Sequence, residues 1–121
     1  LGTSADRRRP DSDRAFCDRK GIFTADVVLV PLEDGDRCEA LLRMGKTVIA
    51  VDLNPLSRTA RTATITIVDN VTRAIPQIEH WINDLKSRKQ SDLKKLVQSW
   101  DNTKNLSKIM SYLSKKLNSM F

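Results

Sequence analysis

Three short apolar runs alternate with polar segments in the middle of the chain. Residues 25–31 (ADVVLVP) and 47–52 (TVIAVD) are continuous apolar runs rich in β-branched side chains, whereas residues 63–69 (ATITIVD) are mixed. Continuous runs of this length are typical of strands that are buried on both faces of a parallel sheet. We therefore expect three strands in a mainly parallel sheet.

Helical spacing of apolar residues appears between the first two strands and after the third. A short stripe predicts a helix that starts like a capping box at Asp36 and ends at Gly45, a natural C-cap. A second helix is expected to follow Asn70, which can cap it, and to reach Leu85. The loop after the second strand, residues 51–60, is expected to lead directly into the third strand. The resulting order is typical of half of a doubly wound sheet, so we predict an α/β, Rossmann-like fold with flanking helices.

The chain divides by composition into three segments. Residues 1–21 are polar, charged and turn-rich, which indicates an irregular basic arm, and residues 22–86 hold the predicted α/β domain. Residues 87–121 carry an amphipathic pattern, for which Ser91 is a candidate cap and residues 102–105 a candidate interruption. This last segment is predicted to form a C-terminal helical extension.

The net charge of +6 is unevenly distributed. Residues 1–25 carry +2, residues 26–85 carry −3 and residues 86–121 carry +7 by counting Lys and Arg against Asp and Glu. Because the predicted domain is acidic, the distribution argues against a nucleic acid partner, and any attraction to polyanions belongs to the tail. The tail could otherwise be a solvated face or a surface for self-association.

Membrane and metal classes find little support in the sequence. No apolar run reaches the roughly 20 residues that a membrane-spanning helix needs. Cys17 and Cys38 have no CxxC or Cys/His spacing, and the chain holds one His, which argues against a fixed structural metal site. Free thiols are typical of a reducing compartment, so we expect a soluble, cytoplasmic protein.

Polar side chains follow each predicted strand. In open α/β sheets, ligands bind beyond the carboxyl ends of the strands, and parallel strands bring these ends to one rim. Carboxylates there can hold a ribose hydroxyl or Mg²⁺, and an arginine fork binds phosphate. The pattern predicts a nucleotide or phosphate site, although acids and amides at strand ends are also common helix caps. The candidate phosphate or magnesium rim after the first strand is Asp34, Asp36 and Arg37.

Two long strings in this region resemble a known family. VVLVPLEDGDRCEAL and MGKTVIAVDLNPLSRTARTATITIVDNVTRAIP are similar to the C-terminal half of archaeal phosphopantothenate synthetase, the 4-phosphopantoate–β-alanine ligase. The resemblance is dense over residues 22–80 and looser in the arm. It does not include residues 86–121, and the N-terminal half of the family has no counterpart in this chain.

The resemblance implies an ATP-dependent ligase of coenzyme A biosynthesis. In such an enzyme the carboxylate of 4-phosphopantoate would attack the α-phosphorus of ATP, and the amine of β-alanine would then displace AMP from the acyl-adenylate. The resemblance also implies a homodimer that works with Mg²⁺. It assigns no catalytic residue in this chain. The positions that it implies for ATP binding are Asp52, Leu53, Asn54, Arg58, Thr59, Asn70 and Val71.

Two other classes of function remain open from the sequence. One is a non-catalytic nucleotide-binding or regulatory module that keeps the fold, which would bind nucleotide without turnover. The other is an interaction protein that uses its basic amphipathic tail. Removal of residues 91–121 followed by a measurement of oligomeric state would separate the tail's role from that of the domain.

Overall fold

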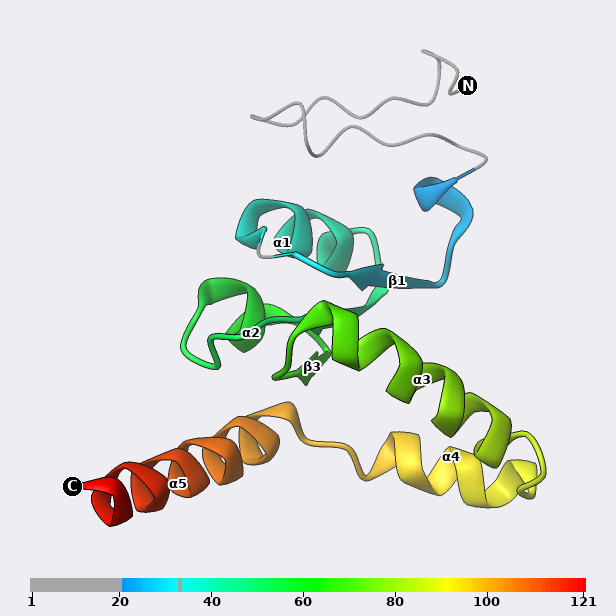
Figure 1. Cartoon of the computed structure of the whole chain (residues 1–121). Coiled ribbons are helices and arrows are strands. Elements are labelled where there is room, and N and C mark those ends of the chain that lie inside the picture. The colour runs from blue at the N-terminus through cyan, green and yellow to red at the C-terminus, as the bar shows by residue number, and fades with distance from the viewer. Residues whose placement is uncertain (1–20, 33) are drawn as a thin grey trace.

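The computed structural model describes residues 21–32 and 34–121 (Figure 1), so the expectations for the arm at residues 1–20, Cys17 included, lie outside it. The first elements are a 3₁₀ turn η3 and a strand β1, followed by a helix α1 and a strand β2. The chain then continues through a short helix α2, a strand β3 and three further helices. Their bounds are η3 Ile22–Thr24, β1 Val27–Val30, α1 Gly35–Arg43, β2 Thr47–Val51, α2 Arg58–Thr62, β3 Ile65–Ile67, α3 Val71–Leu85, α4 Gln90–Gln98 and α5 Asn102–Met120.

The three strands form one parallel sheet in the order β1-β2-β3. The α/β class with flanking helices and a C-terminal helical segment is thus confirmed. The expectation of an uninterrupted loop between the second and third strands was wrong, because residues 58–62 form α2. Parallel neighbours need a crossover connection, and α2 with its flanking turns supplies it.

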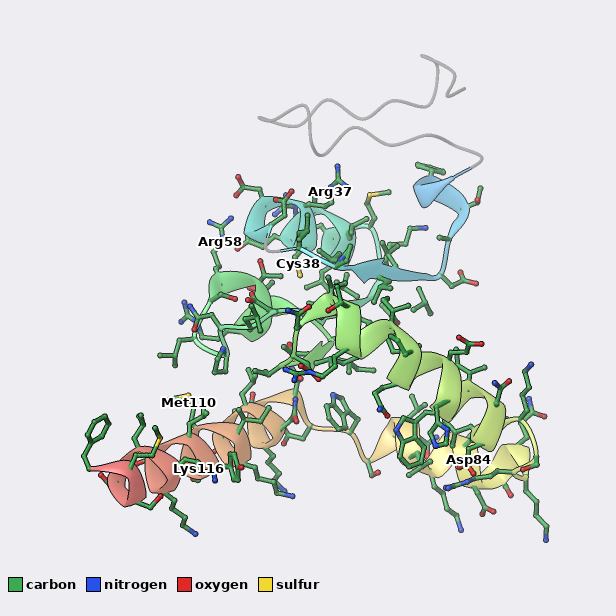
Figure 2. The ribbon with its side chains drawn as sticks, in the orientation of Figure 1. Arg37, Cys38, Arg58, Asp84, Met110 and Lys116 are labelled. Atoms are coloured by element: carbon green, nitrogen blue, oxygen red, sulfur yellow. The ribbon has the colours of Figure 1, made fainter. Side chains whose placement is uncertain are left out.

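The core lies between the sheet and the helices α1 and α2. It consists of Val30, Cys38, Leu41, Val48, Ala50 and Ala63. Cys38 points from α1 towards the sheet (Figure 2) and is completely buried as a free thiol. Burial raises the pKa of this thiol, and the nearby charges of Glu39 and Asp34 raise it further. Cys38 is therefore held in its neutral form and serves as a small apolar core residue.

Within the described residues, the opposite face of the sheet is covered at the carboxyl end of β2, where Val51 is 2% exposed, but it is open along β1. Along β1, Val30 faces the core, whereas Val27 and Leu29 are 54% and 40% exposed. The expectation that this strand is buried on both faces was wrong, because the described structure leaves Val27 and Leu29 exposed on one of them. α3 leaves the end of the sheet and runs towards α4 (Figure 1), and Ala74 is its only buried residue.

Local capping differs from expectation at one helix and agrees at another. The side chain of Asp34, rather than Asp36, caps α1 by accepting a hydrogen bond from the Arg37 N–H at 3.1 Å. Asp36 lies in the first turn instead. Asn70 caps α3 as predicted, and Gly45 has a φ of 80° just beyond the end of α1, which suits a glycine C-cap.

The tail forms two helices separated at residues 99–101, slightly before the interruption that the sequence indicates. α4 begins at Gln90, so Ser91 lies inside the helix and is not its cap. No residue of α4 or α5 is fully buried. Among the described residues, no helix is both long enough and apolar enough to cross a membrane.

The start of α5 is fixed to β3 by side-chain amides. Asn102 Oδ1 accepts a hydrogen bond from the Thr66 N–H at 2.9 Å, and Asn105 Nδ2 donates to the Thr66 carbonyl at 2.9 Å. Because β3 is an edge strand, these two amides occupy the place of a fourth strand's backbone. Trp100 Nε1 adds a hydrogen bond to the Thr64 carbonyl at 3.2 Å.

Candidate nucleotide site

A cleft of about 460 Å³ opens at the carboxyl ends of the three strands. The turn after β1, the loop after β2 and the start of α3 each contribute to its wall. Its lining residues are Pro31, Leu32, Val51, Asp52, Leu53, Asn54, Asp69, Asn70 and Val71. Five of the seven residues implied for ATP binding therefore meet here, whereas Arg58 and Thr59 are not among the lining residues.

Asp52 holds the loop after β2 in shape. The residue is buried, with 8% of its surface exposed, and both of its carboxylate oxygens accept hydrogen bonds. Oδ1 accepts from the Asn54 N–H at 2.9 Å, and Oδ2 accepts from the Ser57 hydroxyl. The same hydroxyl accepts from the Ala60 N–H at 2.9 Å and so caps α2. Asp52 and Ser57 are thus structural residues of the loop, and they fix what the loop presents to the cleft.

Leu53 and Asn54 are the residues that this loop exposes to the cleft. Leu53 is 68% exposed, and the Asn54 side chain is also on the surface. Asn54 Oδ1 accepts from the Leu56 N–H at 2.9 Å, which leaves the Nδ2 group to donate to a ligand. An apolar side chain beside an amide donor can contact a flat, nitrogen-rich ring such as a purine base.

The start of α3 forms the opposite wall. Asn70 Oδ1 accepts from both the N–H and the hydroxyl of Thr72, at 2.9 and 2.7 Å. Asp69 accepts from the Asn70 N–H at 2.7 Å and from Arg73 Nε at 2.9 Å, and these two bonds lower the pKa of Asp69. The first N–H groups of a helix point out of its N-terminus, where they favour an anion.

Arg58 joins α2 to α1 beside this rim. Its guanidinium donates to the Asp36 carboxylate and lies 3.6 Å from Glu39 Oε1, and Figure 2 shows it extending from α2 towards α1. The hydrogen bond that Arg58 donates to Asp36, followed by the negative charges of Asp36 and Glu39, raises the pKa of Arg58. The side chain is 51% exposed, so one side of the guanidinium remains accessible.

Thr59 has a structural contact at the same junction. It is completely buried, and its hydroxyl accepts a hydrogen bond from the Asp34 N–H at 2.9 Å. This bond ties the N-cap of α1 to α2. Of the candidate rim after β1, Asp34 therefore acts as a cap, Asp36 pairs with Arg58, and Arg37 Nε lies 3.9 Å from Asp34 Oδ2.

Within the described residues, no group of three or more His, Cys, Asp or Glu side chains is arranged to hold a metal ion. The carboxylates near the cleft also have protein partners already: Asp52 uses both oxygens, and Asp69 pairs with Arg73. Mg²⁺ commonly binds through one or two carboxylates together with substrate phosphates. The donor set thus fits a magnesium ion that arrives with a nucleotide better than a resident metal.

A second cleft, of about 400 Å³, lies between the loop after β2 and α5. Leu53 lines both clefts. The other lining residues are Val68, Asn105, Lys108, Ile109, Tyr112 and Leu113. Sequence analysis did not assign these residues to a site, although the apolar stripe of the tail did indicate a packing face there.

Comparison with known proteins identifies the family. The sequence profile of the phosphopantothenate/pantothenate synthetase family matches residues 1–116, so the match includes α4 and most of α5, which the resemblance noted above did not cover. A 4-phosphopantoate–β-alanine ligase of Methanosarcina mazei is 54% identical over 108 residues, which are 89% of this chain and 43% of the relative. The ligase of the same name from Thermococcus kodakarensis is 50% identical over 119 residues, which are 97% of this chain and 46% of the relative.

The chain thus spans somewhat less than half the length of these curated relatives. Nearly all of the chain nevertheless takes part in the match, the rim and the loop after β2 included. On this basis the chain belongs to the phosphopantothenate/pantothenate synthetase family.

Proposed function

We propose that this chain carries the ATP-binding part of a 4-phosphopantoate–β-alanine ligase. The observation that carries the proposal is the cleft at the strand ends, which gathers Asp52, Leu53, Asn54, Asn70 and Val71 from two separate loops. Ligands of open α/β sheets bind at this position. The relatives named as ligases supply the reaction class, since a cleft of this kind does not by itself specify substrates.

The proposed reaction proceeds in two steps. The carboxylate of 4-phosphopantoate attacks the α-phosphorus of ATP, which forms an acyl-adenylate and releases pyrophosphate. The amine of β-alanine then attacks the acyl carbon, which forms the amide of 4′-phosphopantothenate and releases AMP. We assign no catalytic residue in this chain to either step.

Individual residues have distinct proposed roles in binding ATP. The adenosine packs against Leu53 and Val71, and Asn54 Nδ2 donates a hydrogen bond to it. The N-terminus of α3, fixed by Asn70, favours the phosphates by its dipole. The accessible side of the Arg58 guanidinium also binds phosphate, and Thr59 supports Arg58 by tying α2 to α1. Mg²⁺ would arrive with the phosphates and neutralise part of their charge, and Asp69, which lines the cleft, would be the carboxylate beside it. By family, we further propose a cytoplasmic homodimer.

The sharpest test of the cleft uses two leucines of one loop. Leu53 lines the cleft and is 68% exposed, whereas Leu56 is 59% exposed and is not among the lining residues. We expect Leu53→Asp to weaken ATP binding by at least about tenfold, because a carboxylate then faces an anionic ligand. Leu56→Asp is the matched control and should bind as the original chain does. Calorimetric titration of ATP with Mg²⁺ measures both.

The titration should be repeated on a chimera. It joins this chain to the part of the Thermococcus kodakarensis ligase that has no match in this chain. The chimera also allows an assay of AMP release with 4-phosphopantoate and β-alanine. The cleft assignment is refuted if Leu53→Asp leaves ATP binding unchanged both in this chain and in the chimera. ATP binding by the chimera without AMP release would favour a non-catalytic nucleotide-binding module.

The role of Arg58 can be tested through its neighbour Gly35 as well as by changing Arg58 itself. A Cβ atom on Gly35 would lie 2.7 Å from Arg58 Nη2, so Gly35→Ala should push the guanidinium away from the start of α1. If Arg58 binds phosphate, Gly35→Ala and Arg58→Ala should both weaken ATP binding, the latter by about tenfold. Arg43→Ala is the control, because Arg43 also lies near Glu39 but is 70% exposed at the far end of α1. Equal binding by all four proteins would restrict Arg58 to holding α1 and α2 together.

A further inference from the structure

The face of the sheet opposite α1 and α2 presents a continuous apolar row. In the register of the parallel strands, Leu29 is opposite Ile49, and Ile49 is opposite Ile65. These three side chains share one face, and Val27 extends the row along β1. Val27 and Leu29 are 54% and 40% exposed, while Ile49 and Ile65 are half-buried. We call Val27, Leu29, Ile49 and Ile65 the open sheet face.

An open face of this kind is unusual for a parallel sheet. Purely parallel sheets occur almost always with both faces covered, and here α1 and α2 cover only one. On the other face Val51 is 2% exposed, so the open part is the side of β1, and Ile75, Trp81 and Ile82 of α3 are themselves 43%, 52% and 51% exposed. Apolar area left in water at this scale marks an interaction surface.

Residues 1–20 offer few apolar side chains for the cover of such a face. Of residues 1–20, ten are charged and five are hydrophobic. Covering a row of four large aliphatic side chains requires a comparable apolar surface. In the relatives, the part without a match in this chain is long enough to supply such a surface. Subtracting the matched shares of 43% and 46% from 100% leaves 57% and 54% of their length.

We propose that the open sheet face binds the part of the family's protein that this chain does not span, whether that part belongs to the same polypeptide or to another. The contact completes the two-sided cover of the parallel sheet. It rests on the bare face and on the family match, and it does not depend on the proposed binding of ATP. A second copy of this chain is the competing occupant.

Cysteine labelling tests the proposal at the centre of the face. Leu29→Cys is introduced with Cys17→Ser into this chain and into the chimera described above, and the rate of reaction with a maleimide is measured in each. We expect fast labelling in this chain and at least about tenfold slower labelling in the chimera. Val27→Cys gives a second reading on the same face. Arg43→Cys is the matched control on the outer side of α1 and should react equally fast in both proteins, since the Arg43 side chain is 70% exposed.

Two results would overturn the proposal. The face stays open if the cysteines of Leu29→Cys and Val27→Cys react with the maleimide as fast in the chimera as in this chain. Protection in this chain alone that increases with its concentration, together with a dimer by light scattering, would assign the face to a second copy. If the chimera is insoluble, cysteine at the aligned positions of the intact Thermococcus kodakarensis ligase gives the same reading, compared with this chain.

Discussion

Asp52→Ala is expected to lower the free energy of unfolding by about 3 kcal/mol and to abolish ATP binding at the cleft. The buried carboxylate accepts from the Asn54 N–H and from the Ser57 hydroxyl. Hydrogen bonds to a charged group contribute roughly 1.5–3 kcal/mol each, so the loss of two accounts for the expected change. Without them the loop after β2 no longer holds Leu53 and Asn54 at the cleft. Urea unfolding followed by circular dichroism measures the stability.

Two further variants separate the hydrogen bonds from the charge. Asp52→Asn keeps an oxygen for the Asn54 N–H, and the Ser57 hydroxyl can turn to accept from the new amide, so we expect roughly half of the loss. Asp84→Ala removes a carboxylate from an exposed pair with Arg88 and should change stability by less than about 1 kcal/mol. An Asp52→Ala protein as stable as the Asp84→Ala protein would contradict the structural role of Asp52.

Much of the candidate site could be predicted because its signals are local. The β-branched runs indicate the strands, and parallel strands bring their carboxyl ends to one rim. That reasoning alone is enough to expect residues 52–54 and 69–71 at one edge of the sheet, where the structure has them. Asn70 as a helix cap was equally predictable, since it directly precedes the apolar repeat of α3.

The predicted start of the first helix was wrong because contacts between distant residues decide it. Asp36 and Glu39 have capping-box spacing, and a local argument therefore favours Asp36. The structure selects Asp34 instead, whose N–H is bound by Thr59, 25 residues further along the chain. Asp36 is in turn held by Arg58. Neither contact leaves a periodic signal in the sequence.

α2 and the bare sheet face escaped prediction for different reasons. A helix of five residues is too short to show an amphipathic repeat, and its clearest signal is the cap at Ser57, which could equally be a ligand donor. The apolar run of β1 does indicate a strand whose two faces are both covered. It cannot indicate which segment covers each face, because apolar residues have the same pattern with any partner.

Asn102→Ala is expected to lower the free energy of unfolding by about 3–4 kcal/mol and to free α5 from the sheet. Asn102 Nδ2 lies 3.2, 3.1 and 3.0 Å from the Ala60 carbonyl, the Ala63 carbonyl and Thr66 Oγ1, and its Oδ1 accepts from the Thr66 N–H. Each net hydrogen bond contributes about 1 kcal/mol, and an unpaired, partly buried Thr66 N–H costs about 1–3 kcal/mol more. Urea unfolding measures the loss of stability.

Hydrogen exchange at one amide identifies the cause of that loss. The Thr66 N–H, which points away from β2 to Asn102, should exchange much faster in the Asn102→Ala protein, while amides that pair β1 with β2 should be less affected. Asn118→Ala is the matched control, because Asn118 is an exposed residue of the same helix. The opposite outcome is a Thr66 N–H that stays protected in the Asn102→Ala protein. Since α5 carries five of the seven residues that line the second cleft, this outcome would mean that the apolar side chains of α5 hold it against the domain. The two amides in the place of a fourth strand would then not be needed.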